Sequence, residues 1–130
     1  MHELTTSPIY LSILSIVLIF LSINIIRLRR KKNIRLLDNG DESLKEAIRA
    51  QANFIEYSPM FLLILISLDL LGANYLLMHS LGCVFCLGRI GHAFSLLYHE
   101  SRTNNFVFRV TGMAMTFTPI ACGAIALLLR

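Results

Sequence analysis

Long stretches of this 130-residue sequence contain no charged residue, and this absence excludes an ordinary water-soluble domain. Residues 4–26 form an uncharged run of 23 positions, and residues 110–129 form another of 20. As a helix, the first run would be about 35 Å long, enough to cross a bilayer core of about 30 Å. The hydrophobic fraction of 55% and the mean hydropathy of +0.65 agree with a membrane protein.

Between these two runs, residues 57–88 contain a single charge, Asp69. This run is too long for one membrane span, and Gly72-Ala73-Asn74 supplies a turn signal that divides it in two. The sequence therefore predicts one all-α integral membrane domain over residues 1–130, a four-helix bundle. We expect its helices at approximately 7–28, 46–71, 75–99 and 105–128.

The N-terminal segment lacks the basic start and the small-residue cleavage site of a signal peptide, so we expect a retained helix. It ends in Arg27-Leu28-Arg29-Arg30-Lys31-Lys32, a stop-transfer pattern. The first loop holds seven of the twelve basic residues and the second loop none. The positive-inside rule then puts the first and third loops in the cytoplasm and both termini on the other side, in the inner membrane if the source is bacterial.

Because the basic run lies against the membrane without interleaved aromatic residues, we expect membrane lipids as partners and no nucleic acid. The three cysteines point to no redox or metal chemistry. Cys83 and Cys86 lie in an apolar helix without a basic neighbour that would lower a thiol pKa, and Cys122 is interpreted as a packing residue. We expect no metal ion.

Polar residues gather where the second helix enters the membrane. Arg49, Asn53, Glu56 and Tyr57 stand at i, i+4, i+7 and i+8, which is one face of a helix. An uncharged run, residues 60–68, follows directly. Charge is expensive at this depth and is usually kept for a purpose, so this face is predicted to bind a small charged ligand.

The third helix carries a second polar set. Arg89 is expected about 15 Å from the cytoplasmic end of its helix, where an arginine must pair or line a cavity. Glu56 is expected at comparable depth, which predicts a buried Glu56–Arg89 pair. His92 lies one turn further along, as a packing residue or as a ligand contact. Gly88 and Gly91 are predicted to allow close helix approach.

Two other charged residues have open interpretations. Arg109 opens the last helix, either as an anchor that reaches the lipid headgroups or as a cation beside a reacting anion. Asp69, near the opposite end of the second helix, is expected to interact with water, Asn74 or His79.

The motif Arg-Ala-Gln-x-Asn-x-x-Glu-Tyr-x-Pro at 49–59, followed by an apolar helix and by Gly-Arg-x-x-His at 88–92, resembles the MAPEG family. These are membrane-associated proteins of eicosanoid and glutathione metabolism, and the chain looks closest to the small bacterial branch. The resemblance implies a homotrimer of four-helix subunits. It also implies that glutathione binds as a co-substrate at the subunit interfaces, near the cytoplasmic side.

The resemblance and the polar pattern together single out a glutathione-binding set: Arg27, Arg29, Arg49, Gln51, Asn53, Glu56, Tyr57, Arg89 and His92. Arg109 resembles the basic residue that activates the thiol in catalytic members, with Arg102 as its rival. Several arginines and one glutamate suit a ligand with two carboxylates and an ammonium group. A thiol with a pKa of about 8.5 also needs a nearby cation to react as the thiolate.

We consider two main classes of function for this sequence. The leading hypothesis is a glutathione-dependent membrane transferase or peroxidase, whose lipophilic electrophile arrives laterally from the bilayer. The alternative is a non-catalytic lipid-binding or scaffolding member of the same family. A transporter is disfavoured, because the sequence shows neither internal repeats nor broken helices.

Overall fold

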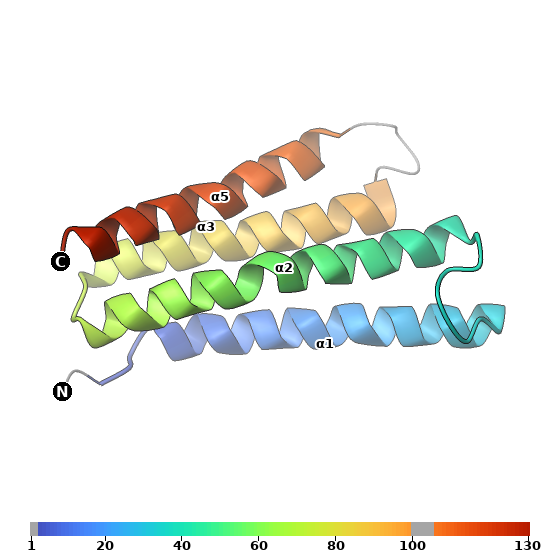
Figure 1. Cartoon of the computed structure of the whole chain (residues 1–130), viewed down its shortest axis with the longest axis horizontal. Helices are drawn as coiled ribbons and strands as arrows, with labels where there is room; N and C mark the ends of the chain where they lie inside the picture. Colours follow the sequence, from blue (N-terminus) through green and yellow to red (C-terminus); the bar gives the residue numbers. More distant parts are fainter. Residues whose placement is uncertain (1–2, 100–105) are drawn as a thin grey trace.

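A computed structural model describes residues 3–99 and 106–130 and shows four long helices that run antiparallel to their chain neighbours (Figure 1). They are α1 (Ser7–Lys32), α2 (Glu42–Leu70), α3 (Tyr75–Phe94) and α5 (Val107–Leu128), and a π-helical turn, η1 (Ser95–His99), continues α3. Each of the four is long and apolar enough to cross a membrane. The predicted all-α membrane four-helix bundle is confirmed.

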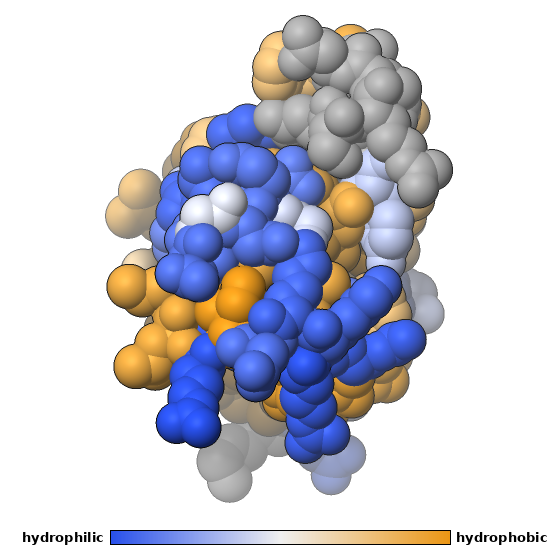
Figure 2. Space-filling model, turned by 90° about the vertical axis from the view of Figure 1, so that its right-hand side faces the viewer, coloured by the Kyte–Doolittle hydropathy of each residue, from blue (hydrophilic) through white to orange (hydrophobic). Residues whose placement is uncertain are grey.

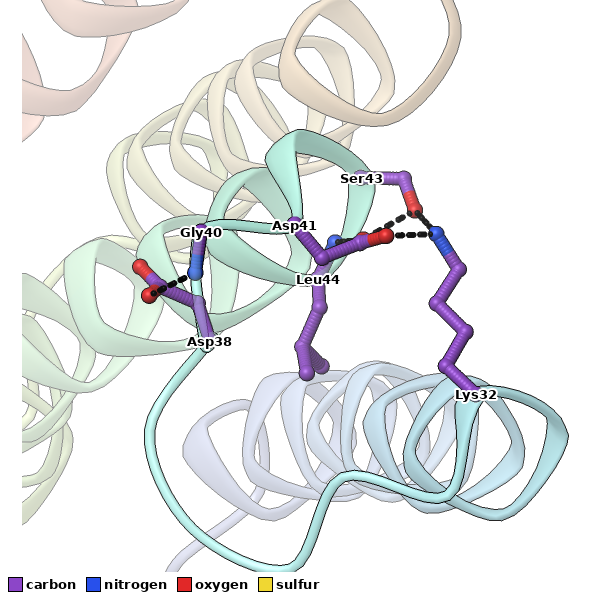
Figure 3. A network of polar contacts seen from close by, with 6 residues as sticks. All are labelled: Lys32, Asp38, Gly40, Asp41, Ser43 and Leu44. Atoms are coloured by element: carbon purple, nitrogen blue, oxygen red, sulfur yellow. Dashed lines mark hydrogen bonds and ion pairs between the residues drawn. The ribbon is translucent and has the colours of Figure 1, made fainter.

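The first connection shows why α1 ends later and α2 begins earlier than expected. Asn33 takes a left-handed conformation with φ of 55° and ends α1 after Lys32. Asp41 caps α2, because its carboxylate accepts a hydrogen bond of 2.8 Å from the backbone N–H of Leu44. Lys32 forms an ion pair with the same carboxylate (Figure 3). The hydrogen bond from Lys32, and then that from Leu44, lower the pKa of Asp41 to about 2.

At the opposite end, Asp69 caps a helix to which it does not belong. Its carboxylate accepts hydrogen bonds of 2.7–3.2 Å from the backbone N–H groups of residues 5–7, where α1 begins without a capping side chain of its own. Asn74 and His79, which the sequence suggested as partners of Asp69, contact other groups instead. Asn74 caps α3, and His79 hydrogen-bonds the Tyr10 hydroxyl at 2.8 Å. Asp69 therefore joins the start of α1 to the end of α2.

The core lies between the helices and is apolar at its centre. α1 packs on α2, and α5 packs on both α2 and α3. Phe61 of α2 and Phe85 of α3 stack with ring centroids 3.9 Å apart, and Leu14 and Leu21 of α1 are also buried. This apolar layer separates the Asp69 end from the polar residues at the other end of α2.

Glycines bring α3 and α5 into backbone contact. A Cβ atom on Gly88 would lie 2.8 Å from Cβ of Met115, and one on Gly112 would lie 2.9 Å from the backbone nitrogen of His92. The predicted close approach at Gly88 is therefore confirmed. The same expectation for Gly91 is wrong for the described residues, because a Cβ atom there would meet none of them within 4 Å.

The basic residues gather at one end of the bundle. Figure 1 places both termini and the α2–α3 turn together, with the α1–α2 connection at the far end. Figure 2 faces that far end and shows long hydrophilic side chains beside apolar surface. The charge asymmetry that the sequence predicts along the bundle axis is thus present in the fold.

Candidate functional site

Arg89 is the centre of a polar cluster that joins three helices. Its guanidinium is fully buried and donates hydrogen bonds to Oδ1 of Asn53 on α2, at 2.5 Å, and to Oγ1 of Thr116 on α5, at 2.9 Å. The guanidinium carbon also lies 5.6 Å from the centre of the Tyr57 ring, a cation–π contact. The burial of Arg89 is therefore compensated in part by neutral acceptors and by one aromatic face, while its Nε has no hydrogen-bond partner among the described residues.

The predicted Glu56–Arg89 pair is wrong as a direct ion pair. Glu56 pairs instead with Arg49, with 3.3 Å between the charged atoms, and both side chains are largely exposed in the single chain. Asn53 is 7% exposed and occupies the inward position of α2 that the prediction assigned to Glu56. A neutral amide at this position satisfies the guanidinium without the cost of desolvating a carboxylate as well.

His92 and Ser95 extend the cluster along α3 and η1. Both side chains are buried, yet within the part of the chain that the structure describes neither Nδ1 of His92 nor Oγ of Ser95 has a hydrogen-bond partner. Arg89, Arg109 and Arg49 all act on His92 electrostatically. The ring therefore keeps a buried polar atom without a described partner, in the electrostatic field of three arginines.

Arg109 approaches this region from α5. It stands on the first turn of its helix, three residues before Gly112, whose backbone contacts His92. Its side chain is exposed in the single chain and makes contacts of its own. Arg102, the rival candidate, lies outside the described residues.

We call this assembly the arginine cluster; it comprises Arg49, Asn53, Glu56, Tyr57, Arg89, His92, Ser95, Arg109 and Thr116. Sequence reasoning missed Thr116 and Ser95. Each has a small hydroxyl side chain in a mostly apolar helical segment, and such residues usually bond their own backbone. The spacing from His92 to Ser95, one helical turn, was the available signal for Ser95.

Three residues of the predicted binding set lie outside the arginine cluster in the single chain. Gln51 turns toward α1 and donates a hydrogen bond of 2.6 Å to Oγ of Ser22. Arg29 donates to the carbonyl of Leu37 at 2.8 Å, and Arg27 lines a pocket on α1. The structure thus divides the predicted set between two faces: one on α2, α3 and α5, and one on α1.

In the described part of the chain, four helices that can each span a membrane pack around the buried Arg89, and this defines an integral membrane protein of the four-helix class. The chain belongs to the MAPEG family, whose sequence profile matches residues 7–129. It is similar to the inner membrane protein YecN of Escherichia coli strain K12, with 28% identity over 111 residues, covering 85% of this chain and 81% of that protein. YecN of Escherichia coli O6:H1 matches to the same extent. No solved structure matches the chain.

Proposed function

We propose that this protein is a glutathione-dependent transferase or peroxidase of the inner membrane that acts on lipophilic electrophiles. One observation carries the proposal: Arg49, Arg89 and Arg109 all act electrostatically on a buried His92 whose Nδ1 has no hydrogen-bond partner among the described residues. Membership of a family that includes glutathione transferases supports it. The name of the bacterial relative supports the inner-membrane location, with both termini on the non-cytoplasmic side by the charge of the loops.

The charges of the arginine cluster complement those of glutathione. Its two carboxylates would bind Arg49 and the neighbouring cations, since a guanidinium donates paired hydrogen bonds to a carboxylate. Its ammonium group would bind Glu56, which then exchanges its partner Arg49 for the ligand. The polar atoms of Tyr57 and His92 would contact the remaining peptide groups. Arg89 is already bonded within the protein and would hold Asn53 and Tyr57 in place.

Arg109 is proposed to lower the pKa of the glutathione thiol. A guanidinium beside the sulfur favours the thiolate by charge and by hydrogen bonding, without acting as a base. The proton leaves to water, and the thiolate sulfur then forms a bond to an electrophilic carbon, whose leaving group departs with the bonding electrons. With a hydroperoxide, the thiolate would attack the terminal oxygen, and the O–O bond would break to release the alcohol. A second glutathione would then form the disulfide and release water, so the two thiols supply the two electrons.

A homotrimer is proposed because part of the arginine cluster is uncovered in the single chain. The Arg49–Glu56 pair is exposed on a helix that spans the membrane, where charge facing lipid is expensive. A second copy would cover this pair, and the face formed by its α1 and α2 would bring Arg29 and Gln51 to the same ligand. Cross-linking and mass measurement in detergent should then give three copies per particle, and a monomer would contradict this assembly.

Calorimetric titration of the detergent-purified protein with glutathione tests the binding site. We expect saturable binding that Arg49→Ala and Glu56→Ala each weaken strongly. Arg130→Ala is the matched control, because this arginine lies at the other end of the bundle, where it donates to the carbonyl of Leu71. Equal losses in Arg49→Ala and Arg130→Ala would contradict the assignment of the site.

Ultraviolet absorbance of the bound thiolate tests the chemistry separately. We expect a thiolate signal in the wild type that Arg109→Ala abolishes while glutathione still binds. Binding without any thiolate signal or turnover would favour the non-catalytic, lipid-binding alternative. No binding at millimolar glutathione would refute the glutathione hypothesis altogether.

A further inference from the structure

An apolar groove runs along the outside of the bundle between α1 and α3. Its volume is about 400 Å³, and its walls include Ile16 and Phe20 of α1 and Ile90 and Phe94 of α3. The groove exists because α1 packs closely on α2 but only loosely on α3. Tyr98 of η1 closes its end nearest the basic loop.

A basic pocket of about 530 Å³ lies beyond this groove. It is lined by Arg27, Arg30 and Lys31, together with Asn24 and with Tyr98, which also lines the groove. The two cavities therefore meet at a tyrosine, a side chain with an apolar ring and a polar tip. Figure 2 faces this end of the bundle and shows hydrophilic side chains beside apolar surface.

One face of α1 passes through both cavities. Ile16, Phe20, Asn24, Arg27 and Lys31 recur every three or four residues, so they follow a single stripe. The stripe is apolar in its first half and basic in its second, over about 22 Å of helix. It therefore changes from apolar to basic along the membrane normal, as a phospholipid changes from acyl chain to phosphate.

Within the described ranges, the cations of the pocket have no protein counter-ion. Among the described residues, Arg27, Arg30 and Lys31 take part in no ion pair, whereas the next residue, Lys32, pairs with Asp41. Scattered basic residues at a helix end would reach separately toward the headgroups. Here the three instead line one concavity that shares Tyr98 with an apolar groove, and basic pockets of this kind between membrane helices bind anionic lipid headgroups.

We propose that this composite cavity is a binding site for one anionic phospholipid from the leaflet at the basic end of the bundle. The phosphate lies among Arg27, Arg30 and Lys31, and an acyl chain fills the groove against Phe20 and Phe94. The lipid fills the space that the loose packing of α1 on α3 leaves open, and it stabilises the position of α1. This site is separate from the arginine cluster and does not depend on glutathione.

The test uses the full chain, delipidated in a neutral detergent, with phosphatidylglycerol and phosphatidylcholine of identical acyl chains. We expect native mass spectrometry to retain one phosphatidylglycerol per chain, and we expect that lipid alone to raise the thermal unfolding temperature. Inorganic phosphate at the same concentration should not stabilise the protein, since it cannot fill the groove. Equal retention and stabilisation by the two lipids, or full stabilisation by phosphate, would overturn the proposal.

Two charge-matched variants locate the site. Arg27→Gln with Lys31→Gln should weaken phosphatidylglycerol binding roughly thirtyfold, because two cations near the anionic headgroup are lost. Arg35→Gln with Lys45→Gln removes the same charge from the same end, outside the pocket, and should bind like the wild type. Equal losses in both variants would show general surface electrostatics and refute a defined site.

The groove is tested by a variant that leaves the charges intact. Ile90→Trp places a large ring in the groove from a position that is 45% exposed, so the bundle should still fold. We expect it to lose phosphatidylglycerol binding while its thermal unfolding without lipid is unchanged. Unchanged lipid binding in this variant would contradict the acyl-chain part of the proposal.

Discussion

Replacing Asn53 by leucine should destabilise the protein through Arg89. The substitution removes the acceptor of a 2.5 Å hydrogen bond and leaves a fully buried guanidinium with Thr116 as its main remaining partner. A hydrogen bond to a charged group contributes about 1.5–3 kcal/mol to the free energy of unfolding. Because the substitution also leaves a buried charge without its partner, we expect a loss near the upper end of this range. We therefore expect Asn53→Leu to lower the free energy of unfolding by about 3 kcal/mol. Thr116→Val should cost about 2 kcal/mol.

A double-mutant cycle isolates the pair from other effects of each substitution. Unfolding is driven by sodium dodecyl sulfate in mixed micelles and followed by circular dichroism. With Arg89→Met as the common partner, the coupling energy to Asn53→Leu should be about 2 kcal/mol. Coupling of Arg89 to Glu56→Gln should stay under about 0.5 kcal/mol, because the structure pairs Glu56 with Arg49.

The two cycles distinguish the structural assignment from the one expected from the sequence. A larger coupling of Arg89 to Glu56 than to Asn53 would refute the assignment of Asn53 as the partner of Arg89. If the Asn53–Arg89 pair is assigned correctly, the double variant Asn53→Leu with Arg89→Met should also regain part of the lost stability. Replacing both partners by apolar groups removes the buried charge together with its need for a partner.

Three further predictions test the fold around the site. Asp69→Asn should lower the free energy of unfolding by about 2 kcal/mol, because the carboxylate that caps α1 loses its charge; the exposed acid change Glu42→Gln should cost under about 0.5 kcal/mol in the same detergent titration. Gly112→Ala should lower the free energy of unfolding by about 1–3 kcal/mol, because the added Cβ would lie 2.9 Å from atoms of α3, whereas Gly91→Ala should be neutral or stabilising. Equal losses of stability in the two variants would contradict the packing of α3 on α5. The pKa of Asp41 is lowered from 3.8 to about 2, so the stability that its carboxylate contributes should be complete above about pH 4 and lost as the pH falls toward 2. The thermal unfolding temperatures of the wild type and of Asp41→Asn should therefore converge over this pH range.

The helices were predictable because each depends on local composition. A run without charge that is long enough to cross a bilayer has few alternatives to a helix, since backbone groups in lipid must be hydrogen-bonded within the segment. The boundaries around residues 28–46 were less predictable. They depend on the left-handed Asn33 and on the contact between Lys32 and Asp41, which joins two helices.

Much of the polar set was also visible in the sequence. Arg49, Asn53, Glu56 and Tyr57 share one helical face, and the structure brings that face to Arg89. Which of them contacts Arg89 could not be read from the spacing. Asn53 and Glu56 are one turn apart, and a small rotation of α2 decides whether the amide or the carboxylate turns inward.

The class of protein, the number of helices and the end of the bundle at which charge gathers are all predictable from the amino-acid sequence, because they follow from hydropathy and charge summed over long segments. The partners of individual polar groups depend instead on how the helices pack. Asp69 capping α1, Asn53 holding Arg89, and the α1–α3 groove opening toward Arg27 all join residues far apart in the chain. Such contacts depend on helix rotation and on glycine-sized gaps such as that at Gly112, and no local pattern encodes them.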